Sequence, residues 1–101
     1  MKRVYLAGKI DGDKNYKEKF RKITEELTAQ GLVVLNPAVL PDGLVRHEYM
    51  QICLPMLLSA DYAIFLPDWK ESAGAVIEYE LCRYINMDRV IMNDDGTLCG
   101  E

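Results

Sequence analysis

The sequence predicts a single α/β domain in which helices cover both faces of a parallel sheet. Short apolar runs rich in β-branched residues alternate with longer segments of helical periodicity, the pattern of strand-helix-strand units joined by right-handed crossovers. A chain of 101 residues with 50% hydrophobic content suits one compact domain with a modest core. No repeat or low-complexity tract divides it, so we expect one domain over residues 1–101, a three-layer sandwich with a parallel sheet of four or five strands.

The first half of the chain predicts a strand, a helix and a second strand. Residues 3–7 (RVYLA) form a short apolar run that ends at Gly8 and is followed by the polar turn KIDGD. Across residues 14–30 apolar side chains recur at helical spacing and charged ones fill the other face, until Gly31 ends the pattern. Residues 32–35 (LVVL) predict a second buried strand.

A loop and a second helix follow. Residues 38–46 contain proline and glycine and predict a loop. Residues 47–59 predict a helix in which Pro55 should cause a kink or mark a separate helix start. The residues expected to face inward are Met50, Leu54, Leu57 and Leu58.

The second half predicts two more strands around a third helix. Residues 61–66 (DYAIFL) and 89–92 (RVIM) are apolar runs typical of buried strands. Between them, residues 67–71 predict a loop, and residues 72–85 predict a helix that is apolar on most sides, as expected beside both a sheet and a neighbouring helix. The polar residues 93–101 predict a frayed end or a short extra strand.

Composition argues against several classes of function. The formal charge of -4 and the pI near 5.0 provide no basic field for sequence-independent binding of nucleic acid. Cys53, Cys82 and Cys99 are widely spaced and lack CxxC pairing, which favours free thiols in a reducing compartment over a zinc site. No run approaches the ~20 apolar residues of a membrane span or has the form of a signal peptide. We therefore expect a cytoplasmic protein that binds neither membranes nor nucleic acid and contains no metal or cofactor.

The candidate site should lie where the predicted strands end. Ligands of parallel α/β sheets bind beyond the carboxyl ends of the strands. Residues 8–13, 36–38 and 67–74 follow three such ends. We expect the functional residues among these segments and in the helix that begins at the third.

That helix begins with the motif SAGAVIEYE. Ser72 is a good N-cap, and the small Ala73 and Gly74 would let a ligand approach the backbone at the positive end of the helix dipole. Helical side chains lean toward the N-terminus, so Glu78 should lie over Gly74. The pattern predicts a carboxylate at the floor of a pocket. It is equally compatible with a surface glutamate on a helix whose small residues allow close packing.

Other candidates each allow two interpretations. Tyr5 could turn its hydroxyl into the site or fill the core, and Trp69 could stack on a base or belong to an interface or lid. His47, the only histidine, is more typical of a solvated helix start than of a general base. Gly8 more often marks a tight turn than a phosphate cradle.

Five matching pieces span nearly the whole chain in order: VYLAGKI (residues 4–10), Asn15 with Phe20, VVLNPA (33–38), YMQICLPMLLSADYAIFLPDW (49–69) and SAGAVIEYELCRY (72–84). In these motifs the sequence resembles the nucleoside 2-deoxyribosyltransferase-like superfamily, most closely its small phage and bacterial branch of DUF4406 proteins. The resemblance implies a flavodoxin-like (Rossmann-like) fold and an enzyme that cleaves or exchanges the N-glycosidic bond of nucleosides or nucleotides.

The resemblance also implies roles for single residues. The family's catalytic glutamate falls on Glu78, which would act as the nucleophile, and its loop tyrosine falls on Tyr5, which would orient Glu78. Ser72 stands where deoxyribosyltransferases have aspartate and where related nucleotide N-glycosidases have a serine that binds the 5′-phosphate, so a nucleoside monophosphate is favoured. Asp11 and Asp68 are the nearest loop carboxylates that could protonate the leaving base.

Two departures from the family pattern keep other functions open. Lys9 replaces the usual proline after the loop glycine, and Cys53 replaces an acidic residue that helps to hold the sugar. A thiol is a poor substitute for a carboxylate. A nucleotide-binding protein without turnover, such as a sensor or a phage sponge for a nucleotide signal, is therefore an alternative, as is a structural or regulatory module with a vestigial pocket.

We thus expect a site for a nucleotide or nucleoside. Its catalytic residues are Glu78 and Tyr5. Its ligand-binding residues are Gly8, Lys9, Ile10, Asn36, Asp68, Trp69, Ser72, Ala73 and Gly74. Relatives in the superfamily are dimers or higher oligomers, and the apolar helical surfaces of residues 50–58 and 75–85 would suit a homo-oligomer.

Overall fold

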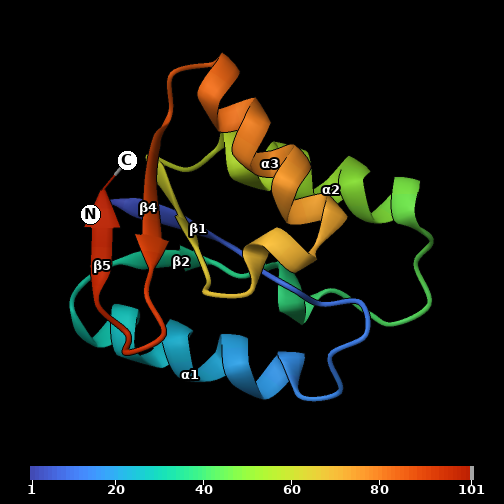
Figure 1. Cartoon of the computed structure of the whole chain (residues 1–101), viewed down its shortest axis with the longest axis horizontal. Helices are drawn as coiled ribbons and strands as arrows, with labels where there is room; N and C mark the ends of the chain where they lie inside the picture. Colours follow the sequence, from blue (N-terminus) through green and yellow to red (C-terminus); the bar gives the residue numbers. More distant parts are fainter. Residues whose placement is uncertain (101) are drawn as a thin grey trace.

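The computed structural model describes residues 1–100 and confirms an α/β domain built on a mostly parallel five-stranded sheet, consistent with a Rossmann-like fold (Figure 1). The spatial order of the strands is β2-β1-β3-β4-β5, and only β5 is antiparallel to its neighbour. The elements are β1 (Arg3–Ala7), α1 (Tyr16–Ala29), β2 (Val33–Leu35), the 3₁₀ turn η1 (Pro37–Val39), α2 (Arg46–Leu58), β3 (Tyr62–Phe65), the 3₁₀ turn η2 (Trp69–Glu71), α3 (Ala73–Tyr84), β4 (Asp88–Met92) and β5 (Leu98–Gly100). No helix within residues 1–100 is long and apolar enough to cross a membrane.

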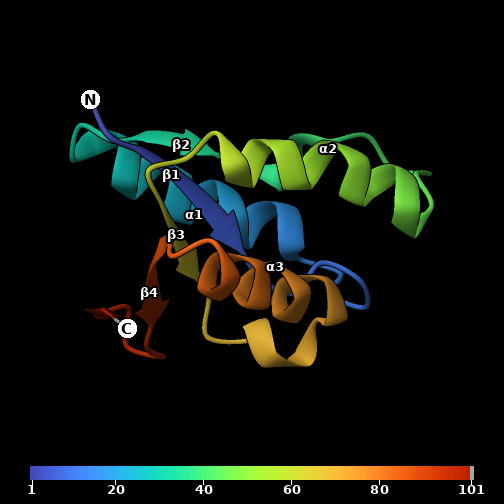
Figure 2. The same cartoon turned by 90° about the horizontal axis from the view of Figure 1, so that it is seen from above.

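The sheet is packed on both faces because successive side chains of a strand point to opposite sides. On β1, Val4 and Leu6 belong to one core cluster with Phe20 and Leu27 of α1. The alternate residues of β1, including Tyr5, belong to a second cluster with residues of α2 and α3. Figure 1 shows α1 on one side of the sheet and α2 and α3 on the other, and Figure 2 shows the last two helices side by side. Tyr5 therefore faces α2 and α3.

Three local expectations need correction. The polar C-terminal segment forms the paired strand β5, which runs antiparallel, so the sheet is not wholly parallel. Pro55 lies inside one helix that begins at Arg46 and does not mark a separate start. Proline has no N–H to donate to the carbonyl four residues earlier, but Pro55 is exposed, so water can hydrogen-bond to that carbonyl. Leu58, expected to face inward, is 54% exposed, whereas Cys53 is fully buried.

The carboxyl ends of β1, β2 and β3 lie at one edge of the sheet, because the three strands are parallel. At this edge Gly8 is required by packing. A Cβ on Gly8 would lie 2.9 Å from the Cβ of Leu66, closer than real Cβ atoms approach, and at a tight 3.2 Å from Oδ1 of Asp68. The missing side chain thus lets the loops after β1 and β3 approach each other, beside the start of α3.

Candidate functional site

A cleft of about 890 Å³ opens at the carboxyl edge of the sheet. The end of β1 and the first two turns of α3 form its floor, and its walls come from the loop before α1, the loop before α2 and the first turns of α2. This volume is in the range of small-molecule sites. The predicted site residues that line the cleft are Tyr5, Gly8, Ile10, Ser72, Ala73, Gly74 and Glu78. The structure therefore brings most of the predicted residues around one cavity.

The floor of the cleft contains a buried hydrogen bond between residues far apart in the sequence. The hydroxyl of Tyr5, on β1, donates to Oε2 of Glu78, on the second turn of α3, at 2.5 Å. The two residues are 1% and 5% exposed, and Glu78 is the buried charged residue within residues 1–100. Burying a carboxylate is costly unless it is hydrogen-bonded. Glu78 is thus not the surface residue that the sequence also allowed.

Burial changes the acidity of both groups. It raises the pKa of Glu78 to about 7, although the hydrogen bond from Tyr5 favours the charged form and opposes the rise. Burial, together with the carboxylate of Glu78, raises the pKa of the Tyr5 phenol far above its usual value of 10. Near neutral pH, Glu78 is therefore a mixture of acid and carboxylate beside a phenol that keeps its proton. Carboxyl groups perturbed in this way are typical of functional sites.

A cysteine and a second tyrosine from α2 lie beside this pair. Burial raises the pKa of the Cys53 thiol to about 11, although the phenols of Tyr5 and Tyr49 oppose the rise, so the thiol stays neutral. Tyr49 lines the cleft and donates its hydroxyl proton to the backbone carbonyl of Pro37 at 2.9 Å. Position 53, where the family resemblance implies an acid, therefore adds no charge near Glu78.

The first turn of α3 leaves space beside its backbone. The hydroxyl of Ser72 caps the helix by accepting from the N–H of Ala75 at 3.2 Å. A Cβ on Gly74 would meet its nearest neighbours, the sulfur of Met50 and the hydroxyl of Ser72, only at 3.9 Å. Packing within the chain therefore does not require glycine at this position. The space at this end of α3 is suited to an anionic group of a ligand, because the helix dipole is positive there.

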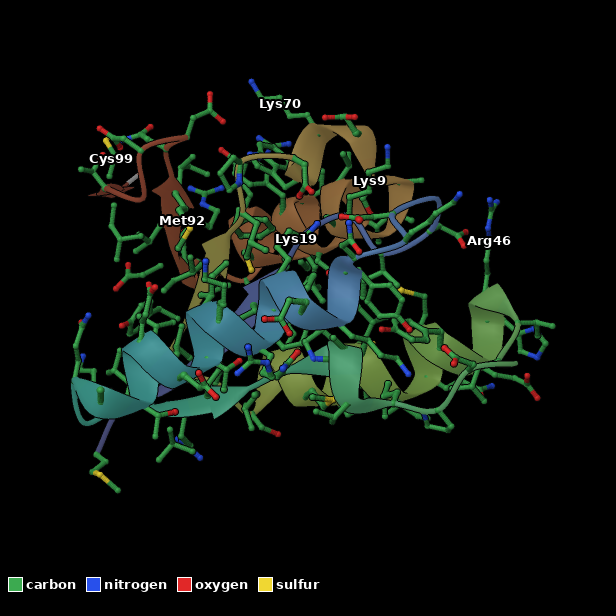
Figure 3. The ribbon with its side chains drawn as sticks, turned by 90° about the horizontal axis from the view of Figure 1, so that it is seen from below. Lys9, Lys19, Arg46, Lys70, Met92 and Cys99 are labelled. Carbon is green, nitrogen blue, oxygen red and sulfur yellow. The ribbon has the colours of Figure 1, made fainter. Side chains whose placement is uncertain are left out.

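Two polar contacts span the mouth of the cleft. The hydroxyl of Tyr16 donates to Asp42 at 3.0 Å and joins α1 to the loop before α2. The guanidinium of Arg46, which projects from the start of α2 (Figure 3), lies 3.8 Å from the carboxylate of Asp11. The Arg46 and Asp11 side chains are 91% and 92% exposed, and ion pairs of this kind contribute little to stability. The Arg46–Asp11 ion pair therefore holds these two segments together only weakly.

Asp68 and Lys9, both predicted to bind the ligand, are not among the residues that line the cleft, and they connect neighbouring loops. Asp68 accepts from the backbone N–H of Lys9 at 3.0 Å and from the ammonium of Lys19 at 2.5 Å. The ammonium of Lys9 pairs with Glu71 at 3.3 Å. Lys9 and Lys19, from the loop after β1 and from α1, lie on neighbouring segments in Figure 3. These contacts fix the loop after β1 to α1 and to the loop after β3, and so support the walls of the cleft.

Trp69 and Asn36 also lie outside the lining. Trp69 is 9% exposed and stacks on Tyr79 of α3, with ring centroids 4.5 Å apart, so it supports α3 from the core. The Asn36 side chain caps η1 by accepting from the N–H of Ala38 at 2.9 Å. His47 is exposed and does not line the cleft. Within residues 1–100, no three histidine, cysteine, aspartate or glutamate side chains are grouped closely enough to hold a metal ion.

Several lining residues were not predicted from the sequence. The main ones are Lys14, Tyr16, Asp42, Leu44, Arg46, Tyr49, Met50 and Ile77. Most belong to the loops before α1 and α2 or to the helix turns next to them, and the path of these loops over the sheet edge is not determined by local periodicity. One feature of the sequence could have indicated Tyr49 as a site residue: it is the first residue of the longest motif shared with the superfamily.

Comparisons with known proteins agree with this fold. A crystal structure of a conserved protein from Enterococcus faecalis V583 is similar, with a TM-score of 0.65 and 18% sequence identity over 90% of this chain. The match covers 62% of that protein, so this chain spans less than two thirds of its length. No curated protein matches the sequence. Residues 2–91 match the family model described as "Domain of unknown function (DUF4406)", and because that match covers most of the chain, the protein belongs to the DUF4406 family.

Proposed function

We propose that the protein binds a nucleotide, preferably a nucleoside monophosphate, and cleaves or transfers it at the N-glycosidic bond with Glu78 as the nucleophile. The observation that carries this proposal is the buried Tyr5–Glu78 hydrogen bond at the floor of a cleft large enough for such a ligand. The resemblance to the nucleoside 2-deoxyribosyltransferase-like superfamily supports the same assignment. A flavodoxin-like three-layer sandwich, supported by core clusters on both faces of the sheet, is part of the proposal.

In the proposed reaction, the ionised carboxylate of Glu78 attacks C1′ of the sugar. The bond from C1′ to the base nitrogen breaks, and its electron pair leaves with the base, which takes up a proton. Water, or a second base, then attacks C1′, releases one proton to the solvent and displaces the carboxylate, which regenerates Glu78. Tyr5 binds Oε2 and so orients Oε1 for attack. With a pKa of about 7, a substantial fraction of Glu78 is ionised at neutral pH.

The first turn of α3 is the proposed position of the 5′-phosphate. Ser72 and Gly74 both line the cleft, and the space beside Gly74 gives an anion access to backbone N–H groups. This turn and Glu78 belong to the same helix. A ligand whose phosphate binds the first turn would therefore present its sugar toward the second turn.

Two further properties belong to the proposal. We propose a homo-oligomer, because α2 and α3 expose apolar side chains that a second copy could cover. The most exposed of them are Ile52, Leu58, Val76, Ile77 and Tyr84. A cytoplasmic location is supported by the three free cysteines, Cys53, Cys82 and Cys99.

Binding without turnover is the second candidate function, and the positions of the loop acids support it. Asp68, one of the two carboxylates proposed to protonate the base, is engaged by Lys19 and by the backbone N–H of Lys9. Asp11, the other, is 92% exposed at the mouth. Cys53 supplies no carboxylate in their place. A protein with these groups could hold a nucleotide signal as a sensor or sponge without cleaving it.

The test measures release of free base by chromatography from ribo- and deoxyribonucleoside monophosphates and from nicotinamide nucleotides. We expect base release by wild type and by Glu80→Gln, an exposed control on the same helix, but not by Glu78→Gln. A nucleotide bound by every variant and cleaved by none would support the sensor or sponge. If no nucleotide in the set is bound and no base is released, both candidate functions are contradicted.

A further inference from the structure

The side chains of Tyr5, Tyr49 and Glu78 present hydrogen-bond acceptors to the cleft. A phenol has a single proton to donate. Tyr5 donates its proton to Glu78 at 2.5 Å, and Tyr49 donates its proton to the carbonyl of Pro37 at 2.9 Å. Both phenol oxygens and the second carboxylate oxygen of Glu78 can therefore only accept when Glu78 is ionised. A ligand group that occupies this part of the cleft must bring its own O–H or N–H.

Tyr49 is the residue in this set that the proposed reaction does not use. It lies on the first turns of α2, lines the cleft and is partly buried. Burial raises the pKa of its phenol, and its ring packs against the core cluster that contains Tyr5 and Cys53. Cys53, one turn further along α2, belongs to that same buried cluster with Tyr5. The two phenols and Glu78 thus line one cleft, which would hold the reacting carbon in the proposed function.

We propose that Tyr49 accepts a hydrogen bond from the 2′-hydroxyl of the ligand's sugar, so that the cleft selects ribonucleotides over 2′-deoxyribonucleotides. The inference rests on the proposed function, because that function brings C1′ to Glu78. C2′ is bonded directly to C1′, so a carboxylate within reach of C1′ lies beside the 2′-hydroxyl. Tyr49 is the phenol that α2 contributes to the lining of the same cleft, and it donates its own proton to the carbonyl of Pro37.

The same geometry explains why a deoxy sugar would bind less well. Without the 2′-hydroxyl, the phenol oxygen of Tyr49 would face a CH₂ group, and it would lose the water that solvates it in the open cleft without gaining a donor. An unsatisfied buried acceptor of this kind weakens binding by about tenfold. A 2′-O-methyl group cannot donate either, so it should bind no better than the deoxy sugar.

The experiment measures affinities for matched ribo-, 2′-deoxy- and 2′-O-methyl-nucleoside monophosphates by calorimetry, or kcat/KM where the nucleotide is turned over. Wild type is compared with Tyr49→Phe and with the control Tyr16→Phe, which removes a phenol from the mouth of the same cleft. We expect wild type and Tyr16→Phe to prefer the ribonucleotide by about tenfold over both analogues. Tyr49→Phe should lose this preference by weakening only the ribonucleotide.

Each result distinguishes the inference from the function on which it rests. If Tyr49 only supported the loop through Pro37, Tyr49→Phe would weaken all three sugars equally, and the unchanged ratio would overturn the inference. Equal affinities of wild type for the ribo and deoxy forms would also overturn it, while leaving nucleotide binding established. No interaction with any nucleotide would overturn the proposed function, and the inference with it. The ligand comparison on wild type holds even if Tyr49→Phe does not fold.

Discussion

Replacing Glu78 by glutamine should stabilise the protein at alkaline pH and have little effect in mild acid. In the folded protein burial raises the pKa of Glu78 to about 7, compared with its usual value of 4.5 in an unfolded chain. Between these values the folded protein holds a proton that the unfolded chain has lost, so the free energy of unfolding falls as the pH rises. This contribution to stability is fully present below pH 4.5 and is lost above about pH 7.

The size of the effect follows from the difference between the two pKa values. The two pKa values differ by about 2.5, and at about 1.4 kcal/mol per pKa unit this corresponds to about 3 kcal/mol in the free energy of unfolding. Glutamine is uncharged at every pH, and its carbonyl can still accept the hydrogen bond from Tyr5. Above pH 7 the free energy of unfolding of Glu78→Gln should therefore exceed that of wild type by about 3 kcal/mol. In mild acid, below pH 4.5, the two proteins should be nearly equal.

Urea unfolding at a series of pH values would measure this difference. Variant and wild type are compared at the same pH, so the effects of other carboxylates cancel, including Asp13 and Asp61, whose pKa values hydrogen bonds lower. Glu80→Gln removes an exposed carboxylate from the same helix and should show no comparable gain at high pH. A Glu78→Gln protein less stable than wild type at alkaline pH, or a difference that does not vary with pH, would contradict the raised pKa of Glu78.

Two further predictions concern the same edge of the sheet. Tyr5→Phe removes the hydrogen bond that lowers the pKa of Glu78, so that pKa should rise above 7 and the pH-dependent loss of stability should move to higher pH; an unchanged profile in urea unfolding would contradict this role. Gly8→Ala should cost about 1–3 kcal/mol, because its Cβ would meet Leu66 at 2.9 Å. Gly74→Ala, with nearest neighbours at 3.9 Å, should be neutral or stabilise the helix by up to about 1 kcal/mol, and equal effects of the two changes in thermal unfolding would refute the packing argument.

The strands and helices were largely predictable because they depend on local pattern. The run RVYLA and the glycine after it predict β1 at its observed bounds, Arg3–Ala7, and apolar periodicity predicts α1 and α3 to nearly theirs. The sequence left open whether β5 forms, because its residues follow a polar segment and all are exposed. Only its pairing with β4 defines it as a strand. Leu58 was wrongly expected to face inward because α2 is apolar on several sides, and its neighbours decide which side is buried.

The site was predictable where helix geometry determines it. Ser72 caps α3 and Glu78 lies one turn beyond Gly74, and both positions follow from the sequence of a single helix. The partner of Glu78 depends on how α3 packs against β1, since Tyr5 is 73 residues away in the sequence. Trp69 was not predictable in this way, because its neighbours in the fold, rather than its position in a loop, determine that it is buried.

If Glu78 is the nucleophile, a glycosyl ester should form on its carboxylate during turnover. The protein would be mixed with a nucleoside monophosphate, quenched in acid, digested and examined by mass spectrometry. We expect a pentose phosphate adduct on the peptide that contains Glu78, and neither adduct nor free base with Glu78→Gln. An adduct on a different residue, or free base released as rapidly by Glu78→Gln as by wild type, would contradict the claim that Glu78 is the nucleophile.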